Sequence, residues 1–182
     1  MRILTVCTGN ICRSPMAEVL LVASAARRGA RPAVASAGLV TEDLPADPHA
    51  VRVMAERGLD LSAHRSRRLT PEMVVDADLL VGMAREHVRE MVALDRSAFS
   101  RSFTLLELAR RGQAVGPVAD DDLTAWLTEV GEDREPMDLI RPAEGYDIDD
   151  PIGQSRRRFR ASAEVIEEAV DAVTALLWPT PG

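Results

Sequence analysis

The chain has 182 residues, of which 46% are hydrophobic and 28% are charged, and its formal net charge at pH 7 is −7. These values predict one globular domain spanning residues 1–182 and argue against disorder. An acidic balance disfavours nucleic acid as a partner, and the apolar runs are too short to cross a membrane. The start of the sequence lacks the basic and then apolar pattern of a signal peptide, and its two cysteines make no disulfide scaffold. We therefore expect a cytoplasmic protein.

The first predicted elements enclose the stretch TVCTGNICRSP at residues 5–15. The apolar run at residues 3–6 suits a buried strand. Ser14 followed by Pro15 is typical of a helix start, with Ser14 as the N-cap and Pro15 as the first helical residue. The stretch therefore predicts a strand, a tight loop and a helix N-terminus. Because this geometry gathers unpaired backbone N–H groups around one point, we expect an anion to bind there.

Strands and helices alternate along the rest of the chain, which predicts an α/β fold with a parallel sheet covered by helices on both faces. Ligands bind such sheets outside the carboxyl ends of the strands, where the loop after the first strand lies. Residues 112–145 are rich in Asp, Glu, Gly and Pro, and we expect an extended acidic loop there with a helical island around Leu123, Trp126 and Leu127. The other expected strands are residues 32–38, 79–81 and 103–105. One expected helix begins at Asp47-Pro48 and ends at Gly58, and a second begins at Thr70-Pro71. Three further helices are expected over residues 86–94, 106–111 and 159–177.

The residues of the first loop suit chemistry on a phosphate group. A thiolate at Cys7 would face the helix N-terminus and the Arg13 guanidinium, which stabilise it as a nucleophile. Arg13 offers a planar fork for two phosphoryl oxygens, and Ser14 can donate its hydroxyl to the thiolate. Gly9 allows a close backbone approach, and Asn10 tolerates the left-handed conformation that turns N–H groups inward. The alternative for a lone cysteine, a small buried hydrophobe at a strand end, does not account for these neighbours.

The motif CTGNICRSP, followed by Met-Ala-Glu, resembles the signature of the low-molecular-weight protein tyrosine phosphatases, which is a cysteine, five residues, an arginine and a serine or threonine near the N-terminus. The resemblance implies a four-stranded parallel sheet flanked by helices, with a phosphate-binding loop after the first strand. It also implies a phosphatase that works through a phosphocysteine without a metal or cofactor. The resemblance continues at Ser36-Ala37-Gly38, Asp47-Pro48, Ala63-His64, Met83 and Asp150-Pro151. Besides Cys7 and Arg13, the loop residues that it assigns to phosphate binding are Thr8, Gly9, Asn10, Ile11, Cys12 and Ser14.

A phosphatase of this kind needs a general acid, which protonates the departing ester oxygen and then deprotonates the water that hydrolyses the phosphocysteine. The resemblance gives this role to Asp150, because Asp150 directly precedes Pro151. Asp149 and Asp147 are the local competitors, and a solvated acidic loop is their other interpretation.

Further residues are implied by the resemblance to support the loop. Asn10, Ser36 and His64 would form a hydrogen-bond network that holds the loop in place. From the residues alone, His64 beside several arginines is equally a surface side chain. Cys12 resembles the family's second loop cysteine, which pairs with the nucleophile on oxidation. From the residues alone, Cys12 is also a small side chain packed beneath the loop.

The sequence departs from the family at the aromatic side chains that commonly wall the cleft of phosphotyrosine-selective members. No aromatic residue occurs between residues 38 and 47, and Ile152-Gly153 follow the Asp-Pro pair. The candidates that replace these walls are Leu39 and Ile152, or Tyr146 and Trp126 from the long loop.

We therefore expect hydrolysis of a phosphorylated protein, with phosphotyrosine favoured and with phosphate and related oxyanions as inhibitors. A protein-arginine phosphatase is the first alternative. A family relative with that activity carries a small threonine at the position of Ile11, so Ile11 favours tyrosine. An arsenate reductase needs further cysteines, and none follows Cys12. The second alternative is a phosphate-binding regulatory module without turnover, but a binder needs neither the thiol of Cys7 nor the acid of Asp150.

Overall fold

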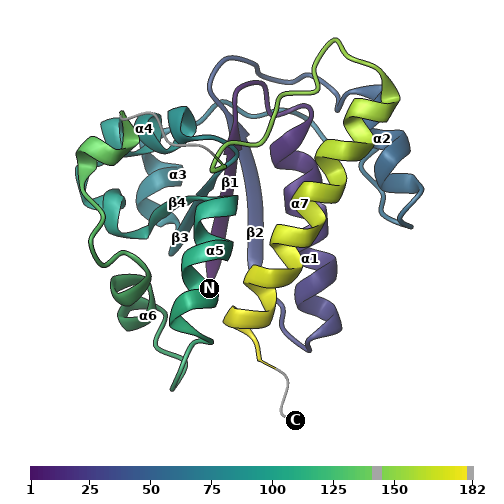
Figure 1. Cartoon of the computed structure of the whole chain (residues 1–182). Helices are drawn as coiled ribbons and strands as arrows, with labels where there is room; N and C mark the ends of the chain where they lie inside the picture. Colours follow the sequence, from purple (N-terminus) through teal and green to yellow (C-terminus); the bar gives the residue numbers. More distant parts are fainter. Residues whose placement is uncertain (141–144, 180–182) are drawn as a thin grey trace.

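Four parallel strands form one sheet in the computed structural model of the chain, which describes residues 1–140 and 145–179 (Figure 1). The strand order is β2-β1-β3-β4. Cys7 pairs with Gly38, and Val6 pairs with Gly82, so the first three strands end together at one edge of the sheet. The expected α/β fold with a four-stranded parallel sheet is confirmed. The strands are β1 Arg2–Cys7, β2 Ala33–Gly38, β3 Leu79–Gly82 and β4 Ser102–Thr104.

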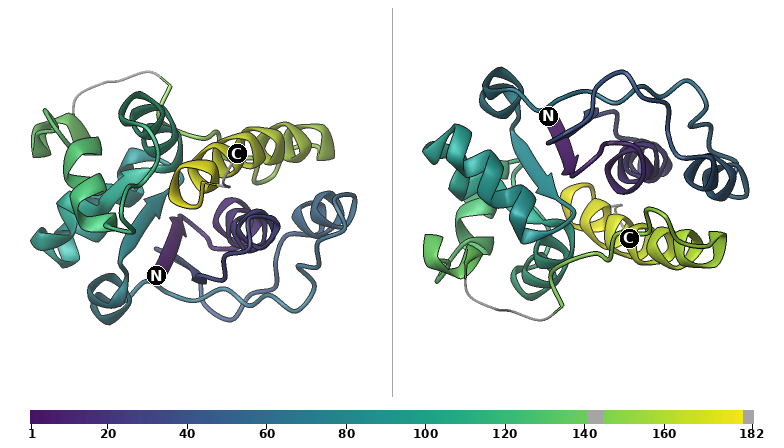
Figure 2. Two further views of the ribbon diagram at one scale, coloured as in Figure 1. Left: turned by 90° about the horizontal axis from the view of Figure 1, so that it is seen from below. Right: turned by 90° about the horizontal axis from the view of Figure 1, so that it is seen from above.

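Helices cover both faces of the sheet (Figure 2). One layer contains α1, α5 and α7, with α2 packed against α7 and α6 packed against α5, and the other contains α3 and α4. Successive residues of β3 therefore face different cores, Leu79 and Val81 the first and Leu80 the second. The helices are α1 Arg13–Arg27, α2 Pro48–Ala55, α3 Pro71–Asp76, α4 Arg85–Leu94, α5 Leu105–Val115, α6 Leu123–Val130 and α7 Arg156–Leu177, with short 3₁₀ helices η1 Arg96–Arg101 and η2 Pro136–Leu139.

Two helix starts follow their predicted capping residues, and one does not. The side chains of Asp47 and Thr70 accept hydrogen bonds from backbone N–H groups of α2 and α3, as N-caps do. The prediction of Ser14 as the N-cap of α1 is wrong, because α1 already begins at Arg13. The Ser14 hydroxyl instead lies 3.0 Å from the sulfur of Cys7 and donates to it. A side chain that could cap the helix is thus used inside the loop.

Two other predicted boundaries can be compared with the structure. Gly58 takes a φ of +73° just after α2, as expected of a residue that ends a helical segment. The predicted strand at residues 103–105 is displaced by one residue, since β4 is Ser102–Thr104 and Leu105 begins α5. The cause is a capping box, in which Thr104 and Glu107 each satisfy the other's backbone N–H.

The region predicted as an extended acidic loop is more regular than expected. Helix α5 continues to Val115, α6 contains the predicted helical island, and η2 follows. Trp126 of α6 is buried against α5, where a Cβ on Gly112 would lie 2.9 Å from its ring. The last part of the predicted loop, residues 141–144, lies outside the described residues. Among the described helices, none combines the length and the apolar character that crossing a membrane requires.

Candidate active site

The loop between β1 and α1 lies at the edge of the sheet where the parallel strands end (Figure 1). This is the edge at which ligands bind in α/β sheets. The end of β2 packs directly against the loop, because a Cβ on Gly38 would lie 2.8 Å from both the backbone nitrogen and the Cβ of Asn10. Only glycine allows this approach, so the last residue of the Ser-Ala-Gly motif fixes the height of the loop above the sheet.

The sulfur of Cys7 accepts two hydrogen bonds at the base of this loop. The donors are the backbone N–H of Asn10, at 3.2 Å, and the hydroxyl of Ser14, at 3.0 Å. Cys7 is buried and unbridged. Both donors point at the sulfur, so they can hold a thiolate in place, and the thiolate is the nucleophilic form of cysteine.

Asn10 is the centre of the hydrogen bonds that hold the loop. Its backbone is left-handed, with a φ of +49°, and its side chain is fully buried. The side-chain amide donates to Ser14 Oγ at 3.0 Å and to Ser36 Oγ at 2.8 Å, and its oxygen accepts from the backbone N–H of Arg67 at 2.8 Å. The backbone carbonyl of Asn10 lies 2.7 Å from Nε2 of His64. The structure therefore brings Ser36 and His64 to Asn10, and Asn10 in turn contacts Ser14.

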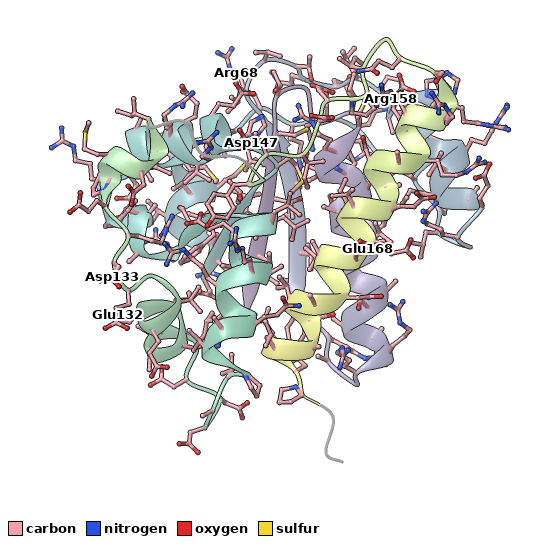
Figure 3. All side chains as sticks on the ribbon, in the orientation of Figure 1. Arg68, Glu132, Asp133, Asp147, Arg158 and Glu168 are labelled. Atoms are coloured by element: carbon pink, nitrogen blue, oxygen red, sulfur yellow. The ribbon has the colours of Figure 1, made fainter. Side chains whose placement is uncertain are left out.

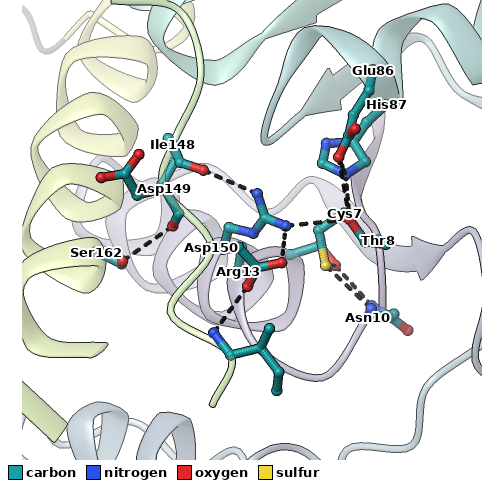
Figure 4. Close-up of polar contacts among 12 residues, drawn as sticks. Cys7, Thr8, Asn10, Arg13, Glu86, His87, Ile148, Asp149, Asp150 and Ser162 are labelled. Atoms are coloured by element: carbon teal, nitrogen blue, oxygen red, sulfur yellow. Dashed lines mark hydrogen bonds and ion pairs between the residues drawn. The ribbon is translucent and has the colours of Figure 1, made fainter. Parts of the chain in front are cut away.

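Arg13 enters the site from the first turn of α1 with its side chain buried (Figure 4). One terminal nitrogen, Nη1, donates to the carbonyl of Ile148 at 3.0 Å, and Nη2 lies 2.5 Å from Oδ2 of Asp150 and 3.3 Å from Oγ1 of Thr8. Among the described residues, its buried Nε has no hydrogen-bond partner. The Ile148 and Thr8 contacts thus fix the guanidinium, and Nε and Nη2 form a pair of donors that can bind two oxygens of a phosphoryl group.

The three predicted acid candidates point in different directions. Asp150 faces Arg13, and its Oδ1 also accepts from the backbone N–H of Ile152 at 3.1 Å. The carboxylate of Asp149 points away from Arg13 in Figure 4. Asp147 is engaged by Arg85, with 3.1 Å between Oδ2 and Nη2, and its pKa lies below its ordinary value as a net result of burial, which raises it, and of the bonds from Arg85, which lower it. Asp150 is the candidate that contacts Arg13 and lines the same pocket as Cys7.

A pocket of about 220 Å³ opens above the sulfur. Its apolar lining comes from Ile11, Val40 and Ile152, and the side chains of Val40 and Ile152 are 64% and 48% exposed. Of the wall candidates, Ile152 lies at the pocket. Leu39 does not, because it packs against the core beneath α3 and α4.

The two aromatic candidates for the walls lie elsewhere. Trp126 is buried in α6, and its Nε1 donates to the carbonyl of Gly116 at 2.8 Å. Tyr146 lies under the guanidinium of Arg110, which is 6.0 Å from the ring centroid. Within the described residues, the pocket wall is therefore aliphatic. Charged side chains labelled in Figure 3, Arg68, Asp147 and Arg158, lie at this same end of the molecule.

Cys12 is buried beneath the loop and belongs to the main core. Burial raises the pKa of its thiol well above the ordinary range, and the negative charge of Asp47 adds to this effect. A thiol held in its protonated form does not compete with Cys7 as a nucleophile. Cys12 therefore packs beneath the loop, as one of its two interpretations predicted, and its pairing with Cys7 on oxidation stays a prediction.

His87 and Glu86 contact the loop and were not predicted from the sequence. His87 and Glu86, at the start of α4, lie 3.0 Å and 3.4 Å from Oγ1 of Thr8. They are separated from the loop by almost eighty positions of sequence, and no local pattern marks them. A buried histidine on the apolar side of a predicted helix was the signal available.

Comparisons with known proteins agree with this geometry. A family model described as "Low molecular weight phosphotyrosine protein phosphatase" matches residues 2–120. The chain is 35% identical over 173 residues to the probable low molecular weight protein-tyrosine-phosphatase EpsP of Ralstonia solanacearum, with 93% of this chain and 91% of that protein covered. It is 40% identical over 109 residues to the protein-arginine-phosphatase of Bacillus subtilis, with 59% of this chain and 71% of that protein covered.

A solved structure shows the same fold. The YwlE arginine phosphatase, as a mutant with a phosphorylated active site serine, superposes with a TM-score of 0.73 at 28% identity, and the alignment covers 97% of this chain and 95% of that chain. The resemblance seen in the sequence is confirmed by the family model and by a relative matched over nearly the whole chain. The chain belongs to the low molecular weight phosphotyrosine protein phosphatase family.

Proposed function

We propose that the protein hydrolyses phosphotyrosine in proteins, with Cys7 as the nucleophile, Arg13 as the phosphate-binding fork and Asp150 as the general acid. The observation that carries the proposal is the convergence of these groups on one pocket. At the base of the pocket the sulfur accepts hydrogen bonds from two donors, and at the rim of the pocket the guanidinium and the carboxylate lie 2.5 Å apart. A module that only bound phosphate would need neither a stabilised thiolate nor a carboxylate at the mouth.

The reaction takes two steps. In the first, Cys7 Sγ bonds to phosphorus while the ester P–O bond breaks, and Asp150 gives its proton to the departing phenolic oxygen. In the second, Asp150 takes a proton from water as the water oxygen bonds to phosphorus and the S–P bond breaks. Inorganic phosphate leaves, and Cys7 returns to the thiolate. Arg13 and the loop N–H groups stabilise the equatorial oxygens in both transition states.

The contact between Arg13 and Asp150 suggests how substrate binding prepares the acid. Nη2 of Arg13 is within hydrogen-bond distance of Oδ2 of Asp150. Phosphoryl oxygens bound by the fork compete with the carboxylate for this nitrogen. Binding of the dianion therefore releases Asp150 from its ion pair and leaves it as a proton donor beside the leaving group.

The pocket wall favours an aryl phosphate. Ile11, Val40 and Ile152 offer apolar surface to a phenyl ring, and the position of Ile11 carries a polar threonine in the arginine-specific relative considered above. A phosphorylated guanidinium keeps several N–H groups that need acceptors. An isoleucine at the pocket supplies none, so removing those groups from water would be costly. Similarity to a protein-arginine-phosphatase makes phosphoarginine the second candidate.

Two measurements test the proposal. Turnover of p-nitrophenyl phosphate in the presence of EDTA, with rapid acid quenching and mass spectrometry, should trap one phosphoryl group on the Cys7 peptide. Matched peptides carrying phosphotyrosine or phosphoarginine should then be compared by kcat/KM. Absence of turnover would refute the enzymatic proposal, and a preference for phosphoarginine would replace the proposed substrate with the second candidate.

A further inference from the structure

His87 is buried against the outer side of the phosphate-binding loop. The ring lies in the first turn of α4 with no exposed surface, and its Nε2 is 3.0 Å from Oγ1 of Thr8. Burial, followed by the positive charge of Arg13, lowers the pKa of His87 from 6.5 to about 3. The imidazole is therefore neutral at physiological pH, and one of its two nitrogens carries the proton.

The Thr8 hydroxyl joins His87 and Glu86 to Arg13. A hydroxyl donates once and accepts up to twice. Nη2 of Arg13, at 3.3 Å, can only donate to this oxygen, and the Glu86 carboxylate, at 3.4 Å, can only accept from it. The third partner is Nε2 of His87, and at 3.0 Å it is the nearest of the three.

The His87 ring also lies close to a carboxylate and to its own helix start. Its Nε2 is 3.3 Å from Oε1 of Glu86, and against the effect of burial a hydrogen bond to the backbone of Ala84 raises the pKa of the ring slightly. The ring is thus held in place from the Thr8 side and from the start of α4.

We propose that His87 and Glu86 act through the hydroxyl of Thr8 as positioning residues that fix the guanidinium of Arg13 for phosphoryl transfer. The inference rests on the proposed function and adds to it a second support of the loop, made by residues other than those that bind Asn10. Asp150 also holds Nη2 in the free protein, at 2.5 Å. Once phosphate takes the place of Asp150, Ile148 on Nη1 and Thr8 on Nη2 are the contacts that keep Nε directed toward the phosphoryl group. Loss of the Thr8 contact lets the fork rotate.

The kinetic test compares four variants with p-nitrophenyl phosphate as substrate. Thr8→Val keeps the shape of the side chain and removes the hydroxyl, and it should lower kcat by about ten- to a hundredfold with a much smaller change in KM. His87→Leu should show the same loss, and the double variant should lose no more than about twofold beyond the worse single one. His87→Gln, whose terminal amide can reach the place of Nε2 and form a hydrogen bond with the Thr8 hydroxyl, should restore most of the activity.

Matched controls separate positioning from folding. His87→Asn places its amide near the position of Nδ1 and should fail to restore kcat. Glu86→Ala should lower kcat several-fold, while Glu90→Ala, which removes an exposed carboxylate one turn further along α4, should leave it unchanged. The melting temperature of each variant is measured as well. If His87→Leu does not fold, Thr8→Val still decides the kinetic question.

Two outcomes of these experiments would overturn the inference. The first is a Thr8→Val kcat within about twofold of the wild-type value, or losses that multiply in the double variant, because independent residues behave in that way. The second is a His87→Gln variant that is no more active than His87→Leu. Tungstate binding by Thr8→Val is measured without turnover. Failure of the proposed function, seen as an inactive wild-type enzyme, is therefore distinguished from failure of this arrangement.

Discussion

Replacing Asp150 with asparagine should expose its role as the general acid. Asparagine keeps the size of the side chain and an oxygen that can accept from the N–H of Ile152, at 3.1 Å in the native protein, but it has no proton to give. Loss of a general acid costs on the order of a hundred- to ten-thousandfold in rate, or about 3–5 kcal/mol of transition-state stabilisation. This loss should apply to esters with basic leaving groups and nearly vanish for esters whose leaving group is already a stable anion.

The structure limits how much of such a loss could come from unfolding. The Asp150 side chain is 38% exposed, and an ion pair at such a site contributes at most about 1 kcal/mol to stability. In a protein of this size that corresponds to a change in melting temperature of roughly 2–4 °C. A kinetic effect of 3–5 kcal/mol would therefore be too large to arise from the lost ion pair.

The assay is a series of aryl phosphates of increasing leaving-group pKa, with kcat/KM measured for the wild type, Asp150→Asn and Asp149→Asn. The Asp150 variant should show a steep fall with leaving-group pKa, and the other two a shallow one. Asp149→Asn is the matched control, because its carboxylate points away from Arg13 and the residue before Pro151 is kept. A steep dependence in the Asp149 variant and a shallow one in the Asp150 variant would exchange the two roles.

Three further predictions follow from the same contacts. Cys7→Ser should abolish turnover while still binding tungstate in calorimetry, because the fork and the loop N–H groups remain; substantial residual activity would reject Cys7 as the nucleophile. Arg13→Lys should lose at least about a hundredfold in kcat, since an ammonium cannot replace a planar fork, and near-normal kinetics would show that the arginine is not at the phosphate. The free energy of unfolding should fall as the pH drops from about 6.5 toward 3, and His87 should contribute up to about 1.4 kcal/mol per pH unit to this fall. The reason is that burial and the charge of Arg13 lower the pKa of His87 in the folded protein to about 3, so the unfolded chain binds the proton at a higher pH. Urea denaturation of His87→Gln should show a shallower slope over this range, and an unchanged slope would contradict the assignment.

The parts of the site that are contiguous in the sequence could be predicted from it. Residues 7–14 form the whole loop, so the residue types that phosphate chemistry needs are neighbours in the sequence and form one recognisable motif. The left-handed backbone of Asn10 and the bond from Ser14 to the sulfur both follow from those residue types. The strands could be predicted because a buried parallel strand is a short apolar run bounded by turn residues.

The parts that depend on distant segments could not be predicted. Leu39 and Val40 are adjacent apolar residues, and which of them faces the pocket depends on how the chain leaves β2. Trp126 is equally suited to a cleft wall or to a core, and packing against α5 decides for the core. His87 carries no local mark, because its partner Thr8 lies on another strand-to-helix connection. Tertiary packing determines the positions of these side chains, and the local sequence pattern does not predict them.

Helix α1 begins without a side-chain cap, and the hydroxyl that could have capped it serves the active site. A helix usually gains about 1 kcal/mol from a side chain that caps its first N–H groups. Here the N-cap position is Cys12, whose side chain makes no such bond, and the one suitable hydroxyl nearby, that of Ser14, donates to the sulfur instead. The pocket is lined by Ile11, Cys12 and Arg13, the residues of this uncapped start. An anion in the pocket can take the place of the cap, so phosphate binding should both satisfy the helix and bring the reacting phosphorus to the thiolate.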